Sequence, residues 1–208
     1  MLNWLLTHSP LLYFTQSLWR DEAFSILAAQ KPLSEILPKL SFEPPVYYIL
    51  LHYWMKVVGT SEIATRSLSF VGFALACVVV ILWAEKLFAK HWLSWFTPLF
   101  FFVNPMLIYY AFEVRTYGWY MFFAVLTLYA YSYKKWPLFI SASTLGFYTH
   151  SYFLIVPSSV AIHWIITNRR ILISPKKLLR EPFLQSMLLF VLLIAPWLIK
   201  ISKALSTL

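Results

Sequence analysis

Long apolar runs, separated by short polar segments, dominate the chain. Residues 67–84, 92–112, 116–133 and 183–199 contain no charged side chain. A helix needs about 20 mostly apolar residues to cross a bilayer, so each run predicts one membrane-spanning helix.

The stretch from residue 136 to residue 168 is also uncharged, but it is too long for one crossing and short for two. Gly146, the polar group Thr149-His150-Ser151 and Pro157 interrupt it. We interpret it as a tight helical hairpin that turns at His150. One long tilted helix is the alternative.

The first residues form a shorter apolar segment with Pro10 inside it, and they lack the basic start and cleavage site of a signal peptide. We interpret them as a clipped first span. The sequence therefore predicts an all-α, polytopic membrane helical bundle in which residues 1–208 form a single core. The seven expected crossings are residues 1–16, 64–85, 92–112, 115–133, 136–149, 151–168 and 183–201.

Composition supports a membrane protein. Hydrophobic residues make up 61% of the chain and charged residues only 12%, against about 25% charged in an ordinary soluble domain. These figures exclude a disordered chain, a collagen-like or coiled-coil fibre and a soluble nucleic-acid binder. The one cysteine, Cys77, excludes a disulfide within the chain.

The charges sort into two groups of loops. If residues 17–63 lie outside the membrane, the external side holds six of the chain's eight acidic residues. The loops at 86–91, 134–135 and 169–182, which include Lys176 and Lys177, then carry the basic residues on the cytoplasmic side. This sorting favours the hairpin and accounts for the net charge of +9 through topology and anionic lipid, without nucleic acid.

The first external segment, residues 17–63, contains two short apolar stretches. SEILPKL and PPVYYILLHYWMKVVG have the length of interfacial or re-entrant helices rather than of spans. Pro44-Pro45 favours a helix start, because proline lacks only an N–H that would have no partner there.

The acidic pair Asp21-Glu22 is the most informative candidate for chemistry. It follows the first span at the external surface, where a partly desolvated carboxylate can act as a general base. The alternative is a helix start, because Asp is a good N-cap and AFSILAAQ favours a helix.

Four further ionisable residues fall on the same predicted face. Glu43 precedes Pro44-Pro45 and is either a cavity carboxylate or an acidic helix start. Glu113 and Arg115, in the turn EVRTY, are either an ion pair or a site in which Arg115 binds phosphate. His150, in YTHSY, is either a phosphate or proton ligand or a structural interfacial histidine.

Other chemistries have no support in the pattern. No His, Cys or acidic residues have the spacing of a strong metal site, and the four glycines form no phosphate loop. We therefore expect no cofactor, and a divalent metal has no sequence support.

Five motifs occur in the order seen in membrane glycosyltransferases of the GT-C superfamily. They are SLWRDEAFS, EPPVYYILLHYW, ATRSLSFVGF, NPMLIYYAFEVRTYGW and YTHSYF. The chain most resembles the branch with protein O-mannosyltransferase-like and lipid A aminoarabinose transferase-like enzymes, over residues 17–165. Many relatives have Ser-Gln where this chain has Ala111-Phe112. The resemblance also implies that this chain covers only the shared core, without the C-terminal module of longer relatives.

The resemblance implies an integral membrane enzyme whose active site faces the extracytoplasmic side. Such an enzyme transfers a sugar from a polyprenyl-phosphate carrier to a glycan, lipid or protein acceptor hydroxyl. By similarity, Asp21 with Glu22 is catalytic, Arg115 and His150 bind the donor phosphate, and Glu43 and Glu113 orient substrate. The alternative is a non-catalytic or truncated protein of this type, which binds polyprenyl lipid or serves as a subunit of a larger assembly.

Overall fold

The computed structural model describes residues 9–14, 16–40, 43–88, 91–172, 178 and 180–206. No strand occurs among these residues, which confirms the all-α fold class. The helices are η1 (Pro10–Phe14), α2 (Arg20–Ala29), α3 (Leu33–Lys39), α4 (Val46–Val58), α5 (Glu62–Ala84), α6 (His91–Ser94), α7 (Leu99–Val103), α8 (Pro105–Ala111), α9 (Tyr117–Ser132), α10 (Trp136–Thr149), η2 (Ser151–Leu154), α11 (Ile155–Thr167), α12 (Arg169–Leu172) and α14 (Pro182–Leu205).

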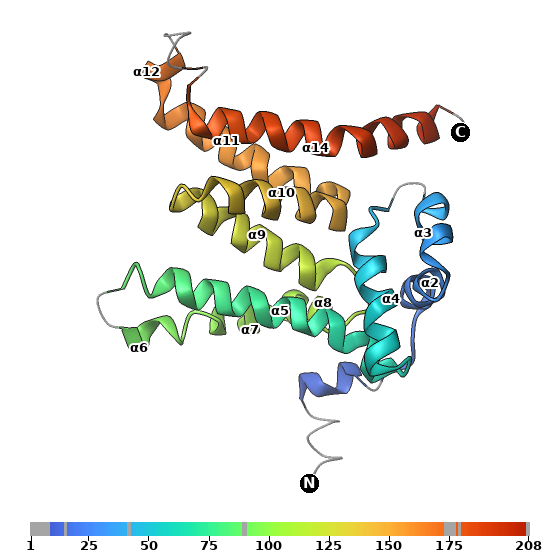
Figure 1. Ribbon diagram of the computed structural model, residues 1–208. Coiled ribbons are helices and arrows are strands. Elements are labelled where there is room, and N and C mark those ends of the chain that lie inside the picture. The colour runs from blue at the N-terminus through green and yellow to red at the C-terminus, as the bar shows by residue number, and fades with distance from the viewer. Residues whose placement is uncertain are drawn as a thin grey trace. The chain divides into compact units, whose positions relative to one another are not determined.

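The chain divides into two compact units. The first unit comprises residues 1–39 and 45–122, and the second comprises residues 40–44 and 123–208. In the first unit α4 packs against α2, α3 and α5, and α5 also packs against α6 and α8 (Figure 1). In the second unit α10 lies along α14 (Figure 1).

Two of the predicted spans are confirmed as helices long and apolar enough to cross a membrane. They are α5, with 23 residues, and α14, with 24 residues. Among the described residues the number rises to three if α6–α8 counts as one broken span. A membrane protein is therefore supported, whereas the count of seven crossings is not confirmed.

The predicted crossing over residues 92–112 is not one continuous helix. Helices α6–α7 and α8 meet at a bend of 88° after Val103. Pro105 removes a backbone donor and clashes with the preceding turn, which breaks a helix. Asn104 then starts α8, because its side chain accepts hydrogen bonds from the N–H groups of Met106 (3.0 Å) and Leu107 (3.4 Å).

The predicted break at His150 is confirmed. Helix α10 ends at Thr149, His150 is extended (φ −155°, ψ 127°) and η2 starts at Ser151. Phe139 and Trp164 both contact Phe183, with ring centroids 5.9 and 5.2 Å apart. One straight helix would separate Phe139 from Trp164 by about 37 Å, so the chain must reverse between them.

The short helices between the spans also correspond to the prediction. Helix α3 covers all of SEILPKL except its last residue and begins one residue before it, and α4 begins directly after Pro45. Helices α9, α10 and α11 have the predicted positions, but their 16, 14 and 13 residues are fewer than the roughly 17 that a span needs.

Most of the expected first span, residues 1–8 and Thr15, lies outside the described residues, as do Lys176 and Lys177.

Candidate functional site

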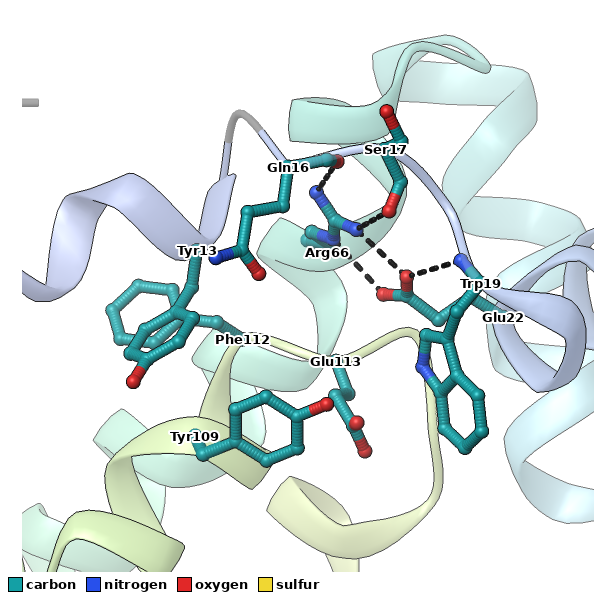
Figure 2. A pocket seen from close by; sticks show the side chains of 9 residues that line it. All are labelled: Tyr13, Gln16, Ser17, Trp19, Glu22, Arg66, Tyr109, Phe112 and Glu113. Atoms are coloured by element: carbon teal, nitrogen blue, oxygen red, sulfur yellow. Dashed lines mark hydrogen bonds and ion pairs between the residues drawn. The ribbon is translucent and has the colours of Figure 1, made fainter. Parts of the chain in front are cut away.

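A buried ion pair between Glu22 and Arg66 joins α2 to α5. Arg66 donates from Nε to Glu22 Oε1 at 2.9 Å and from Nη2 to Oε2 at 2.7 Å (Figure 2). The exposed fractions of the two side chains are 1% for Glu22 and 4% for Arg66. We call this pair the clamp.

The remaining donors of Arg66 hold the segment before α2. They bind the backbone carbonyls of Phe14 (3.2 Å), Gln16 (2.5 Å) and Ser17 (3.4 Å). Trp19 N–H donates to Glu22 Oε2 at 3.4 Å, which closes the first turn of α2. The clamp therefore fixes the path of the chain into α2.

The loop between α8 and α9, residues 112–116, docks on the clamp. Val114 N–H donates to Glu22 Oε1 at 3.0 Å. Ser69 Oγ donates to the Arg115 carbonyl at 3.0 Å, so its 2.9 Å contact with Tyr47 uses the Tyr47 hydroxyl as donor. A β-carbon on Gly118 would lie 2.1 Å from the Ser69 carbonyl oxygen, so only glycine permits this approach of α9 to α5.

A second ion pair lies nearer the surface. Arg115 Nη1 is 3.0 Å from Asp21 Oδ2, and the exposed fractions are 17% for Arg115 and 35% for Asp21. The guanidinium also lies over the ring of Tyr117, 5.8 Å from its centroid. We call Asp21–Arg115 the surface pair. Its exposure allows a ligand to compete for either partner.

Glu113 is buried without a hydrogen-bond partner within the described part of the chain. Only 4% of it is exposed, and neither carboxylate oxygen is hydrogen-bonded. Burial raises the pKa of Glu113, and the negative charges of Glu22 and Asp21 add to this effect. The Tyr109 hydroxyl and Arg115 act in the opposite direction on this pKa.

Glu113 lines a pocket of about 100 Å³ in the first unit, which we call the Glu113 pocket. Aromatic rings form much of its wall, and the clamp forms one side (Figure 2). The lining residues are Tyr13, Gln16, Ser17, Trp19, Glu22, Arg66, Tyr109, Phe112 and Glu113.

The first unit brings together four of the six predicted site residues, namely Asp21, Glu22, Glu113 and Arg115. Glu43 and His150 belong to the second unit. The His150 Nδ1 accepts a hydrogen bond from Tyr152 N–H at 3.2 Å. That these two residues join the other four stays a prediction.

The predicted site residues did not include Arg66, Tyr109 or Ser69. Arg66 carried a usable signal, because it is the only charged residue between Ile63 and Ala84. A charge at that place resembles the end of a span, whereas here it is buried one turn inside α5. Tyr109 and Ser69 carried no such signal.

Within the described ranges no group of three or more His, Cys, Asp or Glu side chains could hold a metal ion. The chain was also compared with protein-family models, with curated proteins and with solved structures, and no match was found.

Proposed function

We propose that the chain is a membrane glycosyltransferase that moves a sugar from a polyprenyl-phosphate carrier to an acceptor hydroxyl at the extracytoplasmic face. The observation that carries the proposal is the surface pair. It places a carboxylate base and a phosphate-binding guanidinium 3.0 Å apart, on segments that are distant in sequence. Glycosyl transfer from a phosphate uses a base for the acceptor hydroxyl and a cation for the departing phosphate, and the surface pair supplies one of each.

In the proposed reaction the acceptor oxygen attacks the anomeric carbon. The bond from that carbon to the phosphate oxygen breaks, and the hydroxyl proton passes to Asp21. Arg115 stabilises the charge that develops on the departing lipid phosphate, because its fork matches phosphate oxygens.

The surface pair allows donor binding to activate the base. Arg115 is ion-paired with Asp21. A donor phosphate competes for the guanidinium, and the carboxylate is then free to accept a proton. Binding of the donor and activation of the base are therefore coupled in this proposal.

The other candidates have supporting roles. Glu22 is occupied by Arg66 and by the Val114 N–H, so we assign it to positioning rather than to proton transfer. Glu43 and His150 retain their proposed roles in orienting substrate and in binding the donor phosphate. No cofactor takes part in this scheme.

A second candidate function is binding of polyprenyl lipid without transfer, including service as a subunit of a larger assembly. One observation favours it: Asp21 and Glu22 are both engaged by arginine. An acid held permanently in such a pair would not act as a base.

The test is an assay of the purified chain in liposomes with polyprenyl-phosphate sugars that carry a radiolabel in the sugar. Release of free lipid phosphate together with a labelled acceptor is expected. Asp21→Asn should reduce the rate by at least about 10²-fold, the lower end of the usual contribution of a general base. The matched control is Glu85→Gln, which removes a carboxylate at the opposite end of α5 and should leave the rate unchanged.

Two results would contradict the proposal, the first the role of Asp21 and the second transfer itself. Near-normal turnover by Asp21→Asn would remove the base from the mechanism. Saturable donor binding without any turnover in the wild-type chain would favour the binding protein.

A further inference from the structure

One carboxylate in the first-unit site, that of Glu113, is not balanced by an arginine that the structure describes. Arg66 balances Glu22 and Arg115 balances Asp21. Glu113 has no such cationic partner among the described residues, and the neutral Tyr109 hydroxyl beside it balances no charge. An unpaired carboxylate at 4% exposure is costly unless a proton or a ligand neutralises it.

The surroundings of Glu113 suit a positively charged ligand. Figure 2 shows its carboxyl group between the Tyr109 hydroxyl and the Trp19 indole in the Glu113 pocket. Tyr13 packs edge-on against Tyr109, with centroids 5.4 Å apart, and extends this wall. Aromatic faces attract cations, and the attraction is stronger where water is excluded.

We propose that the Glu113 pocket binds an organic ammonium group, with Glu113 as its counter-ion and Trp19 and Tyr109 as its aromatic walls. The proposal does not depend on the transferase function, because it uses neither member of the surface pair. The ammonium can come from a phospholipid headgroup or from a small free amine.

Other ligand classes fit less well. A metal ion needs several oxygen ligands, and the described residues hold no group of three or more His, Cys, Asp or Glu side chains arranged to bind one. An anion would be repelled by Glu113, and the donors of Arg66 already bind Glu22 and three backbone carbonyls. A neutral polyol would leave the charge of an ionised Glu113 unbalanced.

The experiment uses thiol reagents of matched size and different charge. Gln16 lines the pocket and is exposed, so Gln16→Cys in a Cys77→Ala background places a thiol at its edge. The reagents are the trimethylammonium-ethyl, hydroxyethyl and sulfonatoethyl methanethiosulfonates. The matched control is Gln30→Cys in the same background, at an exposed position directly after α2.

We compare the rate of modification by the cationic reagent with the rate by the anionic reagent. This ratio of rates should be at least about tenfold higher at the Gln16→Cys thiol than at the Gln30→Cys thiol. Adding Glu113→Gln should abolish this excess. Tetramethylammonium chloride should slow the hydroxyethyl reagent severalfold at the pocket thiol, while equal concentrations of sodium chloride or glycerol should not.

A second variant covers a failure of Glu113→Gln to fold, as judged by circular dichroism and gel filtration. Trp19→Leu changes an exposed side chain and should reduce the protection by tetramethylammonium severalfold. The same ratios of rates among the three reagents at the Gln16→Cys and Gln30→Cys thiols, or protection by glycerol or phosphate as strong as by tetramethylammonium, would overturn the proposal.

Bilayer composition separates the two sources of the ammonium. Protection in phosphatidylethanolamine nanodiscs but not in phosphatidylglycerol nanodiscs would assign the pocket to a lipid headgroup. Protection by tetramethylammonium alone, in both bilayers, would assign it to a free amine. Absence of protection under all these conditions would refute the site.

Discussion

Asp21 and Glu22 are neighbours in the sequence, each bound to an arginine, yet their environments are opposite. Glu22 is 1% exposed and bidentate with Arg66, whereas Asp21 is 35% exposed and lies 3.0 Å from Arg115. Successive side chains on a helix point about 100° apart, so α2 turns one acid into the core and the other outward. A carboxylate–arginine pair therefore stabilises the fold at Glu22, whereas the corresponding pair at Asp21 is open to a ligand.

The largest expected effect comes from breaking the clamp. Arg66→Met should lower the free energy of unfolding by about 3–5 kcal/mol, because it leaves Glu22 charged and buried without its partner. Urea unfolding in mild detergent, followed by circular dichroism, measures this change.

The control for that prediction is the double variant Glu22→Gln with Arg66→Met, which removes the buried charge. It should recover part of the loss but not all, because the carbonyls of Phe14, Gln16 and Ser17 still lack their donor. A single variant as stable as wild type would show that the clamp does not hold the fold.

The next largest effect concerns the loop of residues 112–116, which docks on the clamp and carries Arg115 of the surface pair. Gly118→Ala should cost about 1–3 kcal/mol, because the new methyl group would clash with the Ser69 backbone and push residues 112–116 away from α5. A thermal unfolding scan measures the loss, and Gly59→Ala, where no atom lies within 4 Å of the added carbon, tests backbone strain alone. An unchanged midpoint for Gly118→Ala would contradict the close approach of α5 and α9.

The sequence was sufficient to predict the long, uninterrupted apolar helices. It was insufficient to predict the contacts between helices. Helices α5 and α14 followed from length and polarity alone. The apolar content of residues 92–112 did not predict the break at Asn104-Pro105, because this break depends on side-chain capping. The pairing of Glu22 with Arg66 spans 44 residues, a distance over which periodicity carries no information.

A smaller effect concerns the carboxylate that belongs to neither pair. The pKa of Glu113 is raised by burial, so the folded protein keeps this proton to a higher pH than the unfolded chain does. Its contribution to stability is full below the unfolded pKa and is lost as the pH rises through the folded pKa. Glu113→Gln should flatten the fall in stability above about pH 4.3, measured as thermal midpoints across a pH series. An equally steep fall in that variant would assign the pH dependence to other groups.

The smallest effect on stability should come from breaking the surface pair. It tests directly whether the exposed Asp21–Arg115 pair contributes less to stability than the buried Glu22–Arg66 pair. Arg115→Ala should change the free energy of unfolding by only about 0–1 kcal/mol, because both partners are partly exposed. The same urea titration as for Arg66→Met provides the measurement, so the two arginines are compared under one condition. The variant should also lose most of its response to the lipid-phosphate donor, since Arg115 is the proposed phosphate ligand. A destabilisation as large as that of Arg66→Met would make the surface pair a second structural clamp, and the argument for coupled donor binding and base activation would lose its basis.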